Sequence, residues 1–150
     1  MEEALRQARK AAAKGEVPVG AVLVVNGKIV TKTHNQVEEL KDATAHAEML
    51  AVTAAAGELG DWRLTEATVY VTKEPCPMCA GAMVLSRVKR VVYGAADSRM
   101  GAGGGAINLL QFEGMNHKCE VRGGVKAEEC RDLLKDFFQT KRVENDARGD

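Results

Sequence analysis

Apolar and polar positions follow one another along the chain in blocks that predict alternating helices and strands. The Ala-rich segment 3–14 predicts a helix, which a glycine closes. The compact apolar run 19–25 is typical of a buried strand. Asn26 and Gly27 follow it and favour a tight hairpin, because both residue types tolerate positive φ. The return strand is therefore expected over 28–33.

The middle of the chain predicts a strand-helix-strand unit. Thr44 can cap a helix over 45–56, because its hydroxyl can accept a hydrogen bond from an orphan backbone N–H. The β-branched run 67–72 predicts a strand. A helix over 75–86 follows, since a proline suits its first turn, and 90–95 is the next strand. This spacing predicts two parallel neighbouring strands.

The last third of the chain has weaker patterns. The run 101–105 (GAGGG) predicts a flexible loop, 119–121 a short strand, and 127–142 an amphipathic helix. Residues 143–150 are expected to form a frayed polar tail after a single domain of residues 1–142. Together the elements predict an α/β fold with three α/β/α layers and a mixed central sheet of about five strands.

Composition narrows the class of protein. Of 150 residues, 45% are hydrophobic and 28% charged, which is ordinary for one globular domain and excludes collagen-like or long disordered chains. No apolar run reaches the roughly 18 residues of a membrane span, and the charged N-terminus resembles no secretion signal, so a cytoplasmic protein is expected. Basic and acidic residues balance at 21 each, so no overall basic excess indicates a nucleic-acid partner.

The four cysteines do not form a disulfide framework in an unsecreted chain. Cys119 and Cys130 are isolated and are expected to be small buried hydrophobic residues. Cys76 and Cys79 form a Cys-x-x-Cys motif, which in a reducing compartment indicates either redox chemistry or metal binding.

A histidine upstream favours metal binding. His46, Cys76 and Cys79 supply three zinc ligands, and a catalytic zinc site keeps its fourth position for water. The two cysteines are three apart in the first turn of a predicted helix, so both sulfurs can reach one ion as thiolates. Glu48, two residues after the histidine, can approach the metal-bound water without being a ligand.

The combined pattern, His-x-Glu followed by Pro-Cys-x-x-Cys, is the signature of zinc-dependent base deaminases. One Zn²⁺ per chain would lower the pKa of water toward about 7, and the hydroxide would attack an amino-bearing ring carbon. Glu48 would carry protons to the ring nitrogen and to the leaving amine. A structural zinc site would need a fourth ligand, and a redox Cys-x-x-Cys would not need the upstream His-Ala-Glu.

On these residues the chain resembles the bacterial tRNA-specific adenosine deaminase family, and the likeness extends over almost its whole length. The matching strings lie at residues 15–22, 34–35, 44–48, 74–82, 86–87, 92–97, 108–110, 116–117 and 137–138. The zinc motif alone is shared with cytidine, cytosine and guanine deaminases, whereas the C-terminal strings favour the tRNA enzyme. The chain departs from the family pattern at Lys73, where leucine is common.

The resemblance implies a cytidine-deaminase-like fold, usually a homodimer, and conversion of the wobble adenosine of a tRNA anticodon to inosine by attack at C6. It also implies substrate contacts. Asn35 would hydrogen-bond the flipped adenine, Val17 would line its pocket, and Asp97 would contact the neighbouring nucleotide. Phe137 and Phe138 would lie near the RNA on the last helix.

Two other functions compete with this one. A free-base or nucleoside deaminase, such as guanine or cytosine deaminase, shares the zinc motif but needs no RNA surface. A non-catalytic zinc subunit of a heteromeric editing complex would not need Glu48, whose presence argues against that reading.

Overall fold

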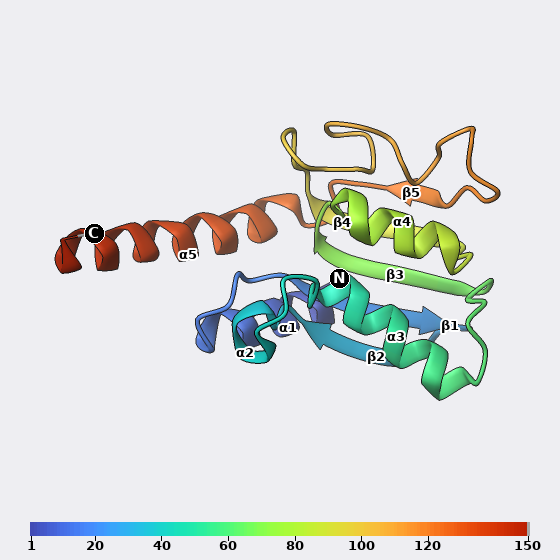
Figure 1. Ribbon diagram of the computed structural model, residues 1–150, viewed down its shortest axis with the longest axis horizontal. Coiled ribbons are helices and arrows are strands. Elements are labelled where there is room, and N and C mark those ends of the chain that lie inside the picture. The colour runs from blue at the N-terminus through green and yellow to red at the C-terminus, as the bar shows by residue number, and fades with distance from the viewer. Residues whose placement is uncertain (150) are drawn as a thin grey trace.

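A single five-stranded mixed sheet organises the computed structural model, which describes residues 1–149 (Figure 1). Its strands are β1 (Gly20–Val25), β2 (Lys28–His34), β3 (Ala67–Lys73), β4 (Arg90–Ala95) and β5 (Glu120–Arg122). Its helices are α1 (Glu2–Ala13), α2 (Val37–Leu40), α3 (Ala47–Leu59), α4 (Pro77–Leu85) and α5 (Ala127–Arg148). The strand order is β2-β1-β3-β4-β5. The pairs β2/β1 and β1/β3 are antiparallel, whereas β3/β4 and β4/β5 are parallel.

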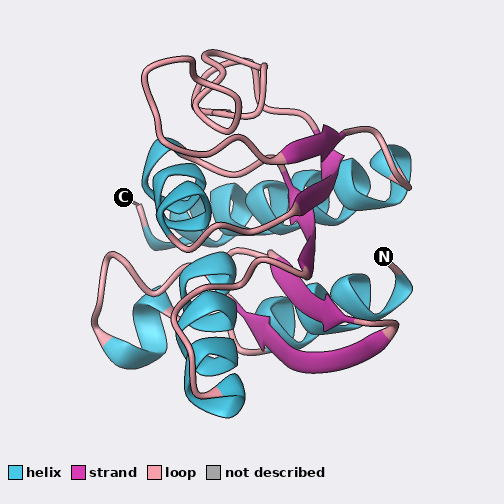
Figure 2. Cartoon of the chain, turned by 90° about the vertical axis from the view of Figure 1, so that its right-hand side faces the viewer, coloured by secondary structure: helices cyan, strands magenta, loops and turns pink. Residues whose placement is uncertain are grey.

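Helices cover both faces of the sheet (Figure 2). α1 packs on β1 and β2 and α5 packs on β3 and β4 on one face, while α3 and α4 lie side by side on the other. The predicted three-layer arrangement and the strand-helix-strand unit β3-α4-β4 are thereby confirmed.

Two glycines let helices approach the sheet closely. A Cβ at Gly20 would meet the backbone of Ala4 and Ala8 in α1. A Cβ at Gly94 would meet the side chain of Cys130 in α5. Both contacts bring a helix nearer to a strand than any other residue would allow.

The main core lies between the sheet and the α3–α4 layer. Its large buried side chains are Leu23, Leu64, Val69, Met83, Val91 and Leu110. Cys119 is part of this core, and Cys130 belongs to a smaller cluster under α1 and α5, so both cysteines are buried as expected.

Local signals at two helix starts are interpreted wrongly from the sequence. Thr44 does not cap α3, because its amide and hydroxyl both donate to the Asp42 carboxylate, at 2.8 and 2.7 Å. His46 takes the cap position instead, in extended backbone geometry. In α4 the first helical residue is Pro77, and Cys76 occupies the cap. The short helix α2 was not predicted.

The last helix is longer than expected. α5 runs to Arg148 and ends at Gly149, whose φ of 76° suits a left-handed cap. The prediction of a frayed tail is therefore wrong for residues 143–148, because no glycine or proline interrupts the helix before Gly149, while Asp150 lies outside the described residues. The far end of α5 projects beyond the body of the molecule (Figure 1). None of the helices in residues 1–149 combines the length and apolar character needed to span a bilayer.

Candidate metal centre and substrate cavity

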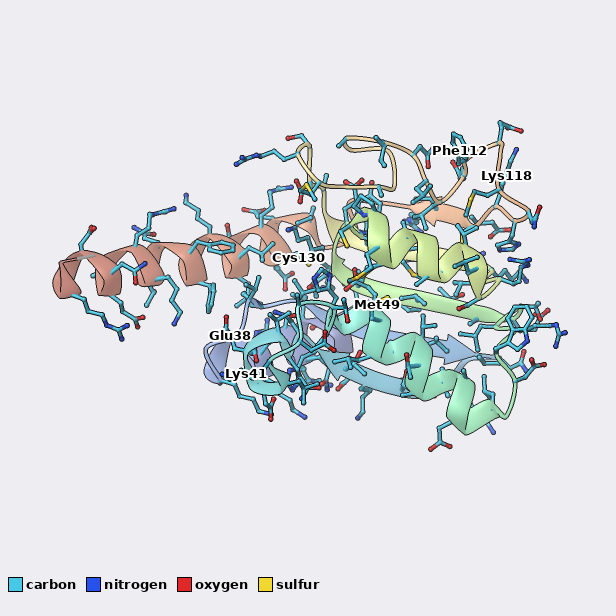
Figure 3. The ribbon with its side chains drawn as sticks, viewed as in Figure 1. Glu38, Lys41, Met49, Phe112, Lys118 and Cys130 are labelled. Atoms are coloured by element: carbon cyan, nitrogen blue, oxygen red, sulfur yellow. The ribbon has the colours of Figure 1, made fainter. Side chains whose placement is uncertain are left out.

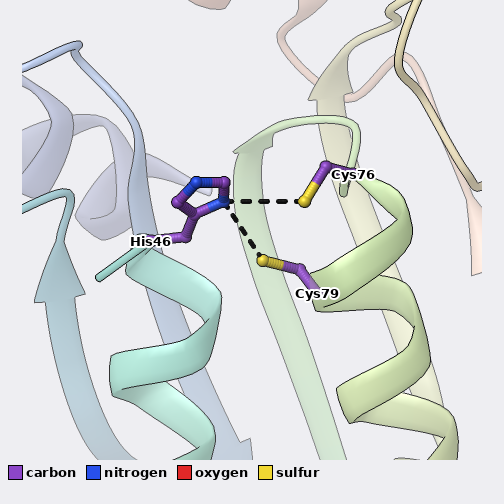
Figure 4. Close-up of side chains that lie close together, drawn as sticks. All are labelled: His46, Cys76 and Cys79. Atoms are coloured by element: carbon purple, nitrogen blue, oxygen red, sulfur yellow. Dashed lines mark hydrogen bonds between the residues drawn. The ribbon is translucent and has the colours of Figure 1, made fainter. Parts of the chain in front are cut away.

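Two helix N-termini bring the predicted metal ligands together. His46 is the cap residue of α3, Cys76 is the cap residue of α4, and Cys79 lies in the first turn of α4. Because α3 and α4 are neighbours on one face of the sheet, the imidazole points at both sulfurs (Figure 4). Helix N-termini favour negative charge, so they suit thiolates.

The spacing of the three donor atoms fits a tetrahedral metal shell. The Nδ1 atom of His46 lies 3.6 Å from Sγ of Cys76 and 3.4 Å from Sγ of Cys79. Zinc–sulfur bonds of about 2.3 Å and zinc–nitrogen bonds of about 2.1 Å at tetrahedral angles place such ligands about 3.6 Å apart. Within residues 1–149, no other group of three His, Cys, Asp or Glu donors gathers in this way.

The groups around Cys76 favour its thiolate form. The neighbouring Cys79 side chain and the His46 imidazole lower the pKa of Cys76 to about 4 against the opposing effect of burial. The proximity of Cys76 and the burial of Cys79 raise the pKa of the Cys79 thiol. A second thiolate beside the first is thus disfavoured unless a cation holds both.

Glu48 is a buried carboxyl in the first turn of α3. It is 4% exposed, and its removal from water is the main cause that raises its pKa to about 7. The negative charge of Cys76 acts in the same direction. A carboxyl that titrates near neutral pH can both accept and donate a proton, which is the property of a general acid–base catalyst.

A cavity of about 660 Å³ connects these groups with the predicted substrate residues. Its wall includes His46, Glu48 and Cys76. The substrate-binding residues expected from the family resemblance also line it: Val17, Asn35, Asp97, Phe137 and Phe138. Cys79 is fully buried and is not part of the wall. The structure therefore places every predicted site residue at or directly behind one cavity.

Glu16 is a buried acid in the wall of the cavity, and the sequence did not predict it as a site residue. Its two oxygens accept the backbone N–H groups of Glu38 and Glu39 at 2.9 and 2.7 Å. These bonds anchor the N-terminal turn of α2, which carries Val37 into the cavity lining. The partners are distant in sequence, so no local pattern signals them.

Glu74 holds the opposite wall in a similar way. Its carboxylate accepts backbone N–H groups from Asp97, Gly103 and Gly105, at 2.9, 2.9 and 2.8 Å. A Cβ at Gly101 or Gly105 would collide with this carboxylate. The glycine-rich segment 101–105, predicted as a flexible loop, is therefore held in place by hydrogen bonds from its backbone N–H groups to the buried Glu74 carboxylate.

Asp97 is oriented at the cavity by several groups. One of its oxygens accepts the N–H groups of Arg99 and Met100, at 2.9 and 3.0 Å. Its other oxygen lies 3.2 Å from the ammonium nitrogen of Lys73. Burial opposes its ionisation, but the two N–H groups and the ammonium outweigh burial and lower the pKa of Asp97.

The last helix supplies an aromatic edge to the cavity. The rings of Phe137 and Phe138 lie 5.5 Å apart and nearly perpendicular. Phe138 is 44% exposed, and the ammonium of Lys141 lies 5.6 Å from the centre of the Phe137 ring. Lys73 and Lys141, which sequence reasoning did not place at the site, are the two cations of the cavity wall within residues 1–149.

Comparison with known proteins decides the family. The profile of the MafB19-like deaminases matches residues 1–142. The tRNA-specific adenosine deaminase of Bacillus subtilis (strain 168) is 54% identical over 147 residues, covering 98% of this chain and 91% of that protein. The chain belongs to the tRNA-specific adenosine deaminase family. As a member of this adenosine deaminase family it is a deaminase, and the recognition from sequence is confirmed.

Solved structures agree with this adenosine deaminase assignment. One comes from a study of A-to-I editing by tRNA:A34 deaminases at the wobble position of transfer RNA. It superposes with a TM-score of 0.86 at 40% identity, covering 89% of this chain and 97% of that one. The guanine deaminase of Bacillus subtilis matches less of this chain, 63%, with a TM-score of 0.61 and 38% identity. The predicted cytidine-deaminase-like fold is confirmed.

Proposed function

We propose that this deaminase hydrolyses the wobble adenosine of a tRNA anticodon to inosine, with one Zn²⁺ held by His46, Cys76 and Cys79. The observation that carries the proposal is the meeting of Glu48 with a three-donor cluster at one cavity. The near-full-length identity to a tRNA-specific adenosine deaminase supports the choice of substrate. Such a substrate implies work in the cytoplasm.

Glu48 would carry out the proton transfers of this reaction. When bound, Zn²⁺ would supply a Lewis acid that lowers the pKa of water toward about 7. Water adds at C6 of the adenine, the C6–N bond breaks, ammonia leaves, and a carbonyl remains. The Glu48 carboxyl, with its pKa raised to about 7, would take a proton from the water and deliver protons to the ring nitrogen and the departing amine.

The remaining wall residues would hold the nucleotide. The target base must leave its stack, and the unpaired anticodon loop allows this at low energy. Asn35, which is 6% exposed and whose N–H donates to the Val19 carbonyl at 3.0 Å, would hydrogen-bond the base. Val17 would pack on its ring, Asp97 would contact the adjacent nucleotide, and Phe138 would stack beside the loop.

A second copy of the chain is the proposed partner at α4. The helix sequence, PMCAGAMVL, contains no charged residue, and a helix that is apolar on all sides is normally covered. Leu85 at its end is nevertheless 64% exposed. The adjoining loop also exposes Ile107 and Phe112, by 50% and 54%. Figure 3 shows Phe112 on this loop. This apolar surface is suited to a homodimer interface.

The decisive experiment incubates zinc-loaded protein with a tRNA carrying an ACG anticodon, next to a tRNA whose wobble base is G. Sequencing of the reverse transcript scores A-to-G conversion at the wobble position. We expect conversion there alone. The Glu48→Ala variant should keep its zinc by metal analysis and lose roughly 10²–10⁴-fold in turnover.

Other outcomes have distinct meanings. Turnover that survives in Glu48→Ala would remove the carboxyl from the mechanism. A folded, zinc-loaded parent that leaves the tRNA unchanged would contradict the proposed substrate. Ammonia release from guanine, cytosine or adenosine would then identify a free-base or nucleoside deaminase.

A further inference from the structure

Acidic residues outnumber basic ones in the lining of the cavity. Five acidic residues line it, Glu16, Glu38, Glu48, Glu74 and Asp97, with two lysines, Lys73 and Lys141. A phosphodiester that follows the target nucleotide toward the metal centre is repelled by this wall unless a cation meets it. Lys141, the cation on α5, is 43% exposed and lies 3.4 Å from the equally exposed Glu144 on the same helix, so neither partner is fixed at the cavity.

The other cation, Lys73, is brought to the wall by the sheet topology. It is the last residue of β3, and the parallel register pairs it with Ala95 at the end of β4. Ligands of α/β sheets bind beyond the carboxyl ends of such strands. Alternation along β3 places Lys73 on the face of Val69 and Val71, the face that α3 and α4 cover.

Lys73 keeps donor capacity for a ligand. Its ammonium carries three N–H donors, and Asp97 at 3.2 Å accepts from it. Within residues 1–149, Lys73 makes no other ion pair or side-chain hydrogen bond. Asp97 is 16% exposed and held by two backbone amides, so it fixes the ammonium in the wall rather than following it into solvent.

We propose that Lys73 binds a phosphodiester of the RNA next to the target nucleotide, and so helps to select a polynucleotide over a free base. This inference rests on the proposed tRNA substrate. Asp97 positions the ammonium, and the phosphate takes the donors that Asp97 leaves. A neutral free base carries no phosphate to pair with the ammonium.

The test measures binding of a fluorescent anticodon stem–loop by anisotropy across a KCl series, with zinc-loaded enzyme carrying Glu48→Gln to prevent turnover. One phosphate contact contributes about 0.7–0.9 to the slope of log Kd against log salt. Lys73→Met should lower the slope by that amount and weaken binding about fivefold at low salt. Lys73→Arg should retain the parental slope.

Lys32→Met is the matched control. Lys32 is also a strand lysine in one ion pair, 3.7 Å from Glu3, but it lies on the edge strand β2, outside the cavity. Its loss should leave the slope unchanged. In the active background, Lys73→Met should raise KM for the stem–loop while kcat changes less than about twofold.

A double variant separates contact from charge compensation. Lys73→Met with Asp97→Asn removes both charges and keeps an oxygen for the Arg99 and Met100 amides. A lowered slope in the double variant supports a phosphate contact. A parental slope in it, or in Lys73→Met alone, overturns the proposal. If the parental enzyme binds the stem–loop without converting it, the proposed substrate is wrong, whereas the slopes still decide the role of Lys73.

Discussion

Glu74 shows how one buried acid can shape a cavity through the backbone of a loop. Its carboxylate is 3% exposed, and its partners are backbone amides of the loop that carries Asp97. Such charge-assisted bonds are stronger than those to neutral acceptors. The position of Asp97 in the cavity thus depends on the Glu74 carboxylate.

Replacement of this acid by its amide should therefore be costly. Glu74→Gln would turn an NH₂ group toward at least one of the amides of Asp97, Gly103 and Gly105. The unmade bonds should lower the free energy of unfolding by about 3 kcal/mol, measured by urea denaturation. Glu66→Gln is the control, since Glu66 is exposed and pairs weakly with Lys89 at 3.9 Å. Equal stability of the two variants would contradict this role.

At the residue scale, the sequence predicts best those site residues that lie close together along the chain. His46 and Glu48 belong to the His-x-Glu motif, and Cys76 and Cys79 belong to the Pro-Cys-x-x-Cys motif at the start of a helix. Lys73 is different, because its partner Asp97 reaches it only through the pairing of β3 with β4. The roles of Asn35, Val17 and Phe138 stay predictions, although their place at the cavity is observed.

At the element scale, the signals that hold are those with a local physical cause. The Asn26-Gly27 hairpin forms with φ values of 51° and 76°, as its residue types favour. The short helix α2 could not be predicted, because its first amides are satisfied by Glu16 from another segment. Thr44 fails as a cap because Asp42 competes for its donors.

Close packing of α1 on β1 predicts a severe effect of a single methyl group. Gly20→Ala would push a Cβ into the backbone of Ala4 and Ala8, so α1 must shift. We expect a loss of about 3 kcal/mol in unfolding free energy. Gly57→Ala, in α3 with open space around it, should instead gain about 0.5–1 kcal/mol, because alanine is the better helix former. Thermal or urea unfolding would reveal the opposite signs, and a neutral Gly20→Ala would refute the close-approach argument.

For the whole molecule, the zero net charge conceals an uneven distribution. Acidic side chains gather at the cavity, while α4 and its adjoining loop offer an apolar surface with no charge on the helix. The overall balance therefore says little about partners. Folding determines which charged and apolar side chains share a surface, and composition alone does not reveal this.

The apolar surface makes a prediction about assembly. The parent should behave as a dimer of 16.1 kDa chains in size-exclusion chromatography with light scattering. Leu85→Glu should give monomers, because it places a charge on the 64% exposed apolar end of α4. Leu59→Glu, at the 45% exposed end of α3, should remain dimeric. A monomeric parent, or a dimer unaffected by Leu85→Glu, would exclude this interface.

The placement of α5 has a consequence for divergence within the family. The predicted metal ligands lie on α3 and α4, whereas Phe137, Phe138 and Lys141 reach the same cavity from a helix packed on the opposite face of the sheet. The predicted catalytic groups and this aromatic edge are therefore attached to opposite faces of one sheet. Under the proposed function, substitutions along α5 should change which nucleic acid is accepted and leave Glu48 and the predicted metal ligands in place.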